Sequence, residues 1–407
     1  MNAKFPGITL NVLTLLLLAA GLTSCSGRNA IATDQLHTES LVWDCHNDLA
    51  YRVLYEGLDI GDRLPGGHVD IPRLKEGKVD VQVVALFIQN YLYPGKAADQ
   101  ALQLLNAMKT NIRKNDGSVE LARTGSDIER ITAAGKIAMP IAIEGGHALE
   151  DDIDKLKMFS DLGVSSMTLT HNIHHGWADC AKGEPRWNGL NDLGRDVIRE
   201  MNRLGMVIDC SHVSDKTFFD VIETSAEPVI FSHSGCRALN LHRRNVSDDM
   251  LRALKGNSGV IGIVFEVTFL SPSYYQAAKE LRAISAPILK KVPPIEDFDL
   301  RIAVEHLSQG REWPLEGKPS VEDLVDHIDH AVKIAGVDHV GLGADMYPRT
   351  PSPEGIRGVQ DYPNITRALK RRGYSDEDVK KIMGGNFLRV WKMVTDGKAE
   401  NRVRSGL

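Results

Sequence analysis

His46 and Asp48 could together bind a metal ion, because they stand two positions apart after a short apolar run. That run, Leu41–Trp43, is typical of a buried β-strand. On an extended backbone alternate side chains point the same way, so the imidazole and the carboxylate lie on one side of the chain. Nitrogen and oxygen donors of this kind are ordinary ligands of divalent metals. A His-x-Asp pair is nevertheless common by chance, so the interpretation depends on ligands elsewhere in the chain.

Further histidine and acidic residues follow later apolar runs, giving seven titratable groups at six predicted strand ends. Three imidazoles and two carboxylates can hold a pair of divalent cations when one carboxylate bridges them. Glu144 suits the bridge, since a carboxylate has two oxygens and the glycines that follow it leave room for close approach. Asp345 could then hydrogen-bond the water between the cations and carry its proton to a leaving amine. The later residues are Glu144, His171, His212, His233 and Asp345.

Eight apolar runs alternate with amphipathic helical patterns, and this alternation predicts how the candidate ligands come together. Several runs are apolar almost throughout, as expected for parallel strands covered on both faces. Eight strand–helix units in about 370 residues favour a (β/α)8 TIM barrel over a doubly wound sheet, and no GxGxxG motif follows the first strand. The working face of such a barrel lies at the C-terminal ends of its strands. The runs are Leu41–Trp43, Val79–Ile88, Ile137–Ile143, Ser166–Leu169, Met206–Asp209, Pro228–Phe231, Gly259–Phe265 and His339–Leu342.

The barrel domain is predicted to span residues 39–396 of the 407-residue chain, with a C-terminal tail at 397–407. Within the domain, residues 271–319 are less regular and contain several prolines. We interpret this stretch as an excursion between the seventh and eighth strands, forming a lid or an interface rather than a separate domain.

Charge and cysteine spacing argue against two classes of site. A formal net charge of -6, without a lysine or arginine cluster, predicts no nucleic-acid partner. The cysteines of the mature chain form no CxxC pair, so a zinc–thiolate site is not expected. An exported protein could pair some of them as disulfides, and the sequence does not say which. They are Cys45, Cys180, Cys210 and Cys236.

The N-terminus has the pattern of a bacterial lipoprotein signal. Its apolar run, Val12–Ala20, is too short to span a bilayer and has the length of a signal-peptide core. The sequence Leu22-Thr23-Ser24-Cys25 resembles a cleavage site that leaves a lipid-modified cysteine at the new N-terminus. We therefore predict a signal peptide at 1–24, a polar tether at 25–38 and anchoring through Cys25 in the cell envelope. The serine after this cysteine favours the outer membrane, and a plain secretory signal is the alternative.

A series of motifs in a fixed order resembles the membrane dipeptidases, the renal dipeptidase family. The resemblance runs from about Asp44 to Val394, which is nearly all of the mature chain. Such a series in order is far more specific than any one of its members. The matching pieces are His46-Asn47-Asp48, Gly67-His68-Val69-Asp70-Ile71-Pro72-Arg73, Glu144-Gly145-Gly146-His147, Leu169-Thr170-His171-Asn172, Trp177-Ala178-Asp179, Ile208-Asp209-Cys210-Ser211-His212-Val213-Ser214, Ser232-His233-Ser234, Arg243-Arg244-Asn245-Val246, Asp338-His339-Val340-Gly341 and Gly385-Asn386-Phe387-Leu388-Arg389-Val390.

The resemblance implies a (β/α)8 barrel of the metallo-dependent hydrolase type that carries a pair of zinc ions. The positions matching His46, Asp48 and Glu144 would hold one zinc. Those matching Glu144, His212 and His233 would hold the other. A hydroxide that bridges the metals would attack the peptide bond.

The resemblance also implies how a dipeptide would be bound. His171 would lie near the carbonyl or the tetrahedral oxyanion, Arg244 would bind the free carboxylate, and Asp345 would handle the proton. A planar guanidinium suits a carboxylate, and an imidazole can donate to an oxyanion, so physical chemistry supports the first two roles independently. Members of the family often accept a D-residue at the C-terminal position and often form homodimers.

Two stretches depart from the family pattern and leave the substrate preference open. Relatives commonly have Asp-Phe-Asp-Gly at the last strand end, whereas this chain has Asp345-Met346-Tyr347-Pro348. After the seventh strand relatives often have Asn-Phe-Tyr, whereas this chain has Val264-Phe265-Glu266.

The main alternative to a dipeptidase is the same binuclear site acting on a lactone, an ester or an N-acyl amino acid. Outside the enzymes, the alternative is a metal-free binding lipoprotein.

Three other residues within the motifs have expected roles outside the metal ligand set. Trp177 and Asp179 are expected to line the pocket near the substrate amine, although a packing role for Trp177 is as consistent with the sequence. His147 is expected to be structural, because the metal ligands are complete without it.

Overall fold

A parallel barrel of eight strands forms the centre of the protein in this computed structural model, which describes residues 31–89, 95–289, 316–346 and 350–404. The ring is joined between its first and last strands, because Cys45 N donates to Leu342 O at 3.1 Å and Asp345 N donates to His46 O at 3.1 Å. The predicted TIM barrel is therefore confirmed. In sheet order the strands are β1 (Trp43–Asp44), β2 (Val81–Gln82) continued by β3 (Val84–Phe87), β5 (Ile137–Glu144), β6 (Val164–Thr168), β7 (Val207–Asp209), β8 (Val229–Ser234), β9 (Val260–Ile263) and β10 (Val340–Leu342).

Each predicted apolar run overlaps a barrel strand, with ends that differ by up to three residues at several strands, and the sheet differs from the prediction in two further details. The run Val79–Ile88 holds two short strands, β2 and β3, rather than one. An additional strand, β4 (Val119–Ala122), pairs with the first half of β5. The sequence did not reveal β4 because its two central side chains are only partly buried, so it has no continuous apolar pattern.

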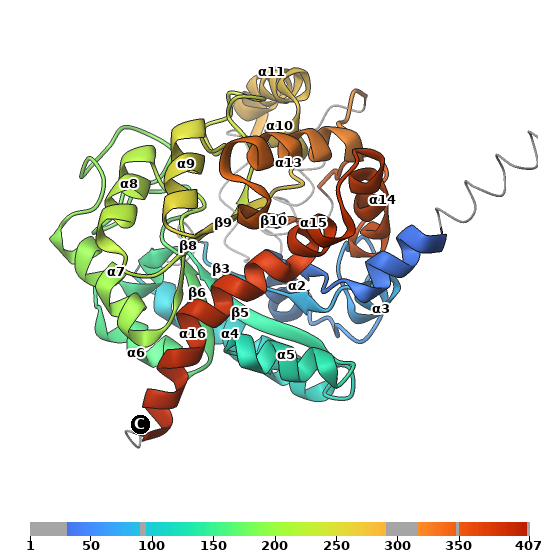
Figure 1. Cartoon of the computed structure of the whole chain (residues 1–407). Helices are drawn as coiled ribbons and strands as arrows, with labels where there is room; N and C mark the ends of the chain where they lie inside the picture. Colours follow the sequence, from blue (N-terminus) through green and yellow to red (C-terminus); the bar gives the residue numbers. More distant parts are fainter. Residues whose placement is uncertain (1–30, 90–94, 290–315, 347–349, 405–407) are drawn as a thin grey trace, which may run out of the picture.

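Helices surround the barrel and follow its strands in alternation (Figure 1). Among the described residues, none of them is both long enough and apolar enough to cross a membrane. The helices are α2 (Leu49–Tyr55), α3 (Ile71–Glu76), α4 (Ala97–Lys114), α5 (Gly125–Ala133), α6 (Asp154–Asp161), α7 (Asp192–Leu204), α8 (Asp215–Thr224), α9 (Asp248–Gly256), α10 (Val267–Leu270), α11 (Pro272–Leu289), α13 (Val321–Ala335), α14 (Pro363–Arg371), α15 (Asp376–Lys380) and α16 (Asn386–Arg404).

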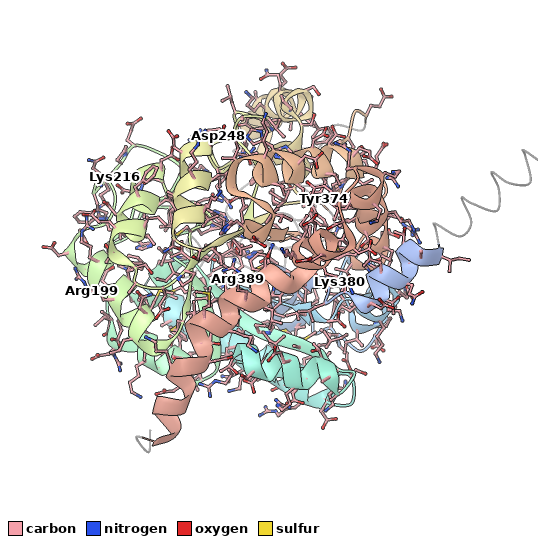
Figure 2. All side chains as sticks on the ribbon, viewed as in Figure 1. Arg199, Lys216, Asp248, Tyr374, Lys380 and Arg389 are labelled. Atoms are coloured by element: carbon pink, nitrogen blue, oxygen red, sulfur yellow. The ribbon has the colours of Figure 1, made fainter. Side chains whose placement is uncertain are left out.

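The long C-terminal helix α16 closes the end of the barrel where the strands begin, and it crosses that end diagonally in Figure 1. The Trp43 ring lies 5.8 Å from the Phe387 ring and 5.1 Å from the Trp391 ring, between centroids. Arg389, labelled in Figure 2, donates to Ser258 O and to Asp338 O, each at 2.8 Å. In the described part of the chain this end is filled by side chains, and the predicted strand-end residues lie at the opposite mouth.

The N-terminal segment is more ordered than a tether. Residues 31–39 form a helix whose Leu36 and His37 are buried. Thr366 Oγ1 donates to His37 Nδ1 at 2.7 Å, and His37 Nε2 donates to Gly77 O at 2.9 Å. The expected tether at 25–38 is therefore corrected for residues 31–38, because Leu36 and His37 of this polar stretch pack into the core. Residues 1–30 lie outside the described part, so the predicted signal peptide and the lipid anchor on Cys25 remain predictions.

The other predicted boundaries meet the structure only in part. The helix α16 continues into the segment 397–407 that was interpreted as a tail. In the predicted excursion at 271–319, most of α11 occupies the first part, and residues 290–315 lie outside the described ranges.

Candidate metal centre

The five predicted metal ligands converge at the mouth of the barrel, around the carboxylate of Glu144. Glu144 Oε2 lies 3.6 Å from His46 Nε2, whereas its Oε1 lies 3.2 Å from His212 Nε2 and 3.8 Å from His233 Nε2. Asp48 joins the first of these groups, and in each group the candidate ligand atoms lie within 4.8 Å of one another. The two oxygens of one carboxylate therefore face two different sets of ligands.

The donor atoms of this cluster fit a pair of divalent cations. His46 Nε2 and Asp48 Oδ1 are buried, and neither has a hydrogen-bond partner among the described residues. His212 Nε2 and His233 Nε2 face each other at 3.0 Å. Buried polar atoms are normally paired, so unpaired nitrogens and oxygens that point into one space indicate a ligand. Imidazole nitrogens and carboxylate oxygens are the donors that zinc accepts in catalytic sites.

The electrostatics of the cluster favour positive charge among its carboxylates. Burial raises the pKa of Asp48 well above its ordinary value, and the nearby Glu144 carboxylate raises it further. Burial opposes charge on His46, yet the carboxylates of Glu144, Asp345 and Asp48 raise its pKa to about 10. Carboxylates gathered in a desolvated space are unfavourable unless a cation balances them.

Asp345 lies at the edge of the cluster, directly after β10. Its Oδ1 is 3.8 Å from His46 Nε2, and 22% of its side chain is exposed. Its backbone has a φ of 53°, a left-handed conformation that non-glycine residues adopt rarely and mostly where function requires it. Burial raises the pKa of this carboxyl to about 7. Asp345 therefore borders the space between the candidate ligand sets.

His171 follows β6 and flanks the cluster on another side. Its ring lies 4.7 Å from the Phe87 ring and 4.5 Å from the His212 ring, between centroids. Burial lowers its pKa to about 4, so the ring is neutral near pH 7. Asn172 Nδ2 donates to His171 Nε2 at 3.2 Å, which makes Nδ1 the protonated nitrogen.

Arg244 brings a buried guanidinium to the same mouth. Its Nη1 lies 2.7 Å from His212 Nδ1, and its Nη2 donates to His233 O at 3.4 Å. The guanidinium carbon lies 5.4 Å from the centre of the Phe269 ring. Asn245 fixes the loop, because its Nδ2 donates to Phe269 O at 2.9 Å and its Oδ1 accepts from Gly235 N at 3.1 Å.

His327, on α13, anchors the other end of this loop and must be neutral to do so. Its Nδ1 accepts from Cys236 N at 2.9 Å, and its Nε2 donates to Leu270 O at 3.1 Å. Burial lowers its pKa to about 4. The neutral ring therefore ties the Arg244 loop to the end of α10.

This histidine should make stability depend on pH. An unfolded histidine titrates near 6.5, so its contribution is complete above that pH and is lost as the pH falls toward 4. We expect His327→Asn to be destabilised at pH 7.5, since the bond to Leu270 O is lost. At pH 4.5 the wild type itself is destabilised, because its buried ring stays neutral while the unfolded histidine is protonated. The difference in unfolding free energy between wild type and variant should therefore be about 2 kcal/mol smaller at pH 4.5 than at pH 7.5. Urea denaturation at both pH values measures this, and an equal deficit at both would contradict it.

A hydrogen-bonded chain behind His233 was not identified from the sequence. Ser232 Oγ lies 2.7 Å from His233 Nδ1 and 2.5 Å from Asp209 Oδ2, and Asp209 also accepts from Thr168 Oγ1 at 2.5 Å. With the Ser232 hydroxyl donating to Asp209, it accepts from His233 Nδ1 and leaves Nε2 free as a ligand. The only sequence signal was that Asp209 and Ser232 stand within the quoted motifs.

Removing this orienting hydroxyl should weaken metal binding without removing a ligand. We expect Ser232→Ala to bind zinc roughly ten- to a hundredfold more weakly, because partners of this kind fix ligand orientation. Competition with a chromophoric chelator measures the affinity, and Ser126→Ala, a serine at the exposed start of α5, is the matched control. An unchanged zinc affinity would show that His233 needs no such partner.

Two residues expected near the substrate amine lie instead in the wall behind the site. The Asp179 carboxylate accepts from the backbone N–H groups of Arg186, Trp187 and Gly189 at 2.9–3.2 Å, and it is fully buried. Trp177 is also fully buried, in the position of a packing residue. The expectation for Asp179 is corrected, because its oxygens are used in holding the 179–189 loop.

The four cysteines in the described part of the chain form no disulfide with one another. Each of the four is buried and free in the described part of the chain. They are Cys45, Cys180, Cys210 and Cys236.

Comparison with known proteins finds relatives that match most of the chain. The family model described as membrane dipeptidase (peptidase family M19) matches residues 31–405. The dipeptidase tcpJ of Claviceps purpurea is 32% identical over 374 residues, covering 88% of this chain and 78% of that protein. The crystal structure of the probable dipeptidase PvdM from Pseudomonas aeruginosa is 27% identical, covers 90% of this chain and 98% of its own, and superposes with a TM-score of 0.78. A Rhodobacter sphaeroides metallopeptidase, solved with a phosphinate mimic of L-Ala-D-Ala, shares the fold at 23% identity and a TM-score of 0.71, covering 88% and 100% of the two chains. The chain belongs to the membrane dipeptidase family, peptidase family M19.

Proposed function

We propose that this protein is a zinc-dependent dipeptidase whose substrates include dipeptides with a C-terminal D-residue. The observation that carries the proposal is the placement of Glu144 between two sets of metal ligands, with Arg244 and Asp345 at the same mouth. The dipeptidase relatives support the substrate class.

The side chains divide the work of the proposed reaction. Bound zinc ions supply an activated water and polarise the peptide carbonyl. His46, Asp48, Glu144, His212 and His233 would hold them.

Three further side chains would bind the substrate and move the proton. Arg244 presents a planar guanidinium fork beside His212, and such a fork suits the free carboxylate of a dipeptide. His171, protonated at Nδ1, would donate to the developing oxyanion. Asp345 would take the water proton and deliver it to the leaving amine.

A panel of substrates distinguishes the proposed dipeptidase from the alternative functions. L,L- and L,D-dipeptides, a lactone, an ester and an N-acyl amino acid are assayed with and without a chelator. We expect dipeptides to be cleaved fastest, with activity lost to the chelator and restored by zinc. Rapid lactone or ester hydrolysis beside slow dipeptide cleavage would reject the peptidase assignment. Failure to retain any metal after zinc addition would favour a binding protein.

The role of Arg244 has its own test. We expect Arg244→Ala to raise KM for dipeptides at least tenfold, because a charge-assisted pair with the substrate carboxylate contributes about 1.5–3 kcal/mol. Dipeptide amides, which lack that carboxylate, should lose much less. Steady-state kinetics on both substrate types measures the difference, and an unchanged KM for dipeptides would contradict the carboxylate role.

We further propose that the protein is held in the cell envelope by a lipid on Cys25, facing the periplasm or the exterior, and that it forms homodimers. The support is the N-terminal sequence pattern and the family resemblance. Labelling with a radioactive fatty acid, lost in Cys25→Ser, tests the anchor.

A further inference from the structure

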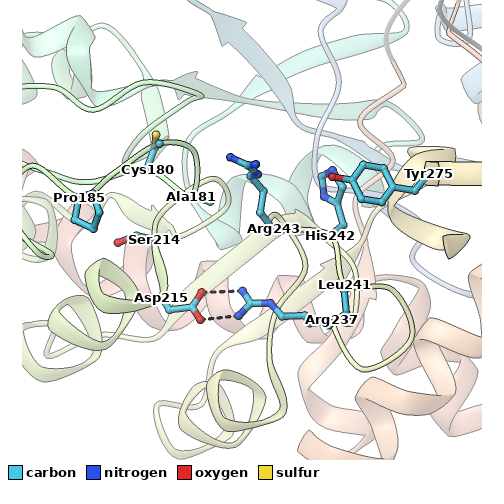
Figure 3. A pocket seen from close by; sticks show the side chains of 11 residues that line it. Cys180, Ala181, Pro185, Ser214, Asp215, Arg237, Leu241, His242, Arg243 and Tyr275 are labelled. Carbon is cyan, nitrogen blue, oxygen red and sulfur yellow. Dashed lines mark hydrogen bonds and ion pairs between the residues drawn. The ribbon is translucent and has the colours of Figure 1, made fainter. Parts of the chain in front are cut away.

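A pocket of about 410 Å³ lies next to the candidate metal centre and has no part in the reaction described above (Figure 3). Its volume falls within the range of small-molecule sites. One wall is the loop from Cys180 to Pro185, another is the loop that carries His242 and Arg243, and Tyr275 of α11 completes it.

The pocket and the metal centre share a wall. Ala181, which lines the pocket, donates its N–H to the carbonyl of the candidate ligand His212 at 2.7 Å. Arg243 directly precedes Arg244, whose guanidinium reaches the ring of the same histidine. The His242 ring stacks on Phe269 at 4.1 Å between centroids, and the Arg244 guanidinium lies over that phenyl ring too. The pocket therefore adjoins the segments that carry His212 and Arg244, the arginine that binds the substrate carboxylate in the proposed function.

The charge that the pocket offers is positive. Arg237 and Asp215, below Arg243 in Figure 3, neutralise each other through two hydrogen bonds of 2.6 and 2.7 Å. Arg243 is exposed and makes no hydrogen bond or ion pair with another described residue, and Figure 3 shows its guanidinium projecting toward Ala181. A guanidinium fork without a protein partner fits a carboxylate in two-point geometry.

We propose that this pocket binds an acidic side chain on the C-terminal residue of the substrate, so that Arg244 takes the α-carboxylate and Arg243 the side-chain carboxylate. The inference rests on the proposed dipeptidase function and specifies its preferred substrates as dipeptides with an acidic C-terminal residue. Pro185 and Leu241 offer apolar surface to the methylene groups of that side chain. A basic side chain is repelled by Arg243, and an amide forms only neutral hydrogen bonds with it, which are weaker.

The test compares L-Ala-L-Glu with its neutral isostere L-Ala-L-Gln, and L-Ala-L-Asp with L-Ala-L-Asn, on the zinc-loaded protein. We expect kcat/KM to favour the acidic member of each pair about tenfold at low salt, and this ratio to fall as NaCl rises to 1 M, because the ion pair is screened. In Arg243→Gln the ratio should drop to about one. Arg252→Gln is the matched control, since that arginine lies on the outer face of α9, where 58% of its side chain is exposed and Asp249 pairs with it.

The outcomes separate the two levels of the proposal. A ratio at or below one in the wild type, or a tenfold ratio that survives Arg243→Gln, overturns the assignment of the pocket while the dipeptidase function stands. Loss of the ratio in Arg252→Gln as well overturns it too, because a general change of charge would then explain the preference. If none of the four dipeptides and no alanyl-alanine is cleaved, the proposed function itself has failed.

Discussion

Asp345→Asn should keep both zinc ions and lose most of its turnover. Asparagine preserves the shape of the side chain and can still hydrogen-bond the water, but it cannot accept a proton. General acid–base catalysis contributes roughly a hundred- to ten-thousandfold, so kcat for dipeptides should fall by that factor with little change in KM. Steady-state kinetics and metal analysis of the same preparation measure the two quantities.

Metal analysis decides between two roles that the geometry allows for Asp345. Its Oδ1 lies 3.8 Å from His46 Nε2, and with His46 and His233 it forms a further group that could hold a cation. Loss of one zinc in Asp345→Asn would therefore make it a ligand, whereas an unchanged kcat would remove it from proton transfer. Asp249→Asn is the control, since 83% of that side chain is exposed on α9.

Glu144→Gln should lose metal and activity together. Glu144 is the only one of the five predicted ligands that belongs to both ligand sets, and an amide has no negative charge to share between two cations. We expect zinc affinity to fall by roughly a hundredfold or more, beyond the effect of losing an orienting partner. Dipeptide hydrolysis should become undetectable at stoichiometric zinc.

Thermal unfolding gives this second prediction an independent measure. A metal that binds only the folded state raises its stability, so the wild type should melt at a higher temperature with zinc than with a chelator. In Glu144→Gln this difference should nearly disappear. In Glu223→Gln, at a side chain that is 77% exposed, it should persist. Full zinc content and a full thermal shift in Glu144→Gln would show that the centre is held together without a bridge.

Most of the barrel could be predicted because the relevant signals are local. A buried parallel strand is apolar almost throughout, and each of the eight runs is read within a few residues. The strand β4 was not predicted, because its stability comes from pairing with β5, which its own four residues do not encode. The helix at 31–39 was not predicted for a similar reason, since His37 contacts Gly77 and Thr366, which lie far away in the sequence.

The sequence by itself determined which titratable residues stand at the strand ends, because a strand followed by a His or an acidic residue is a local pattern, and the family resemblance selected the five predicted ligands among them. Only the tertiary structure decided the distances. The pairing of the first strands puts His46 within 3.6 Å of Glu144, nearly a hundred positions later, and closure of the barrel brings Asp345 beside His46. Folding also fixed the left-handed backbone of His212, at a φ of 72°, and the serine that orients His233. Folding alone brought Arg243 to the pocket, because the two loops and the helix α11 that line it meet only in the folded chain.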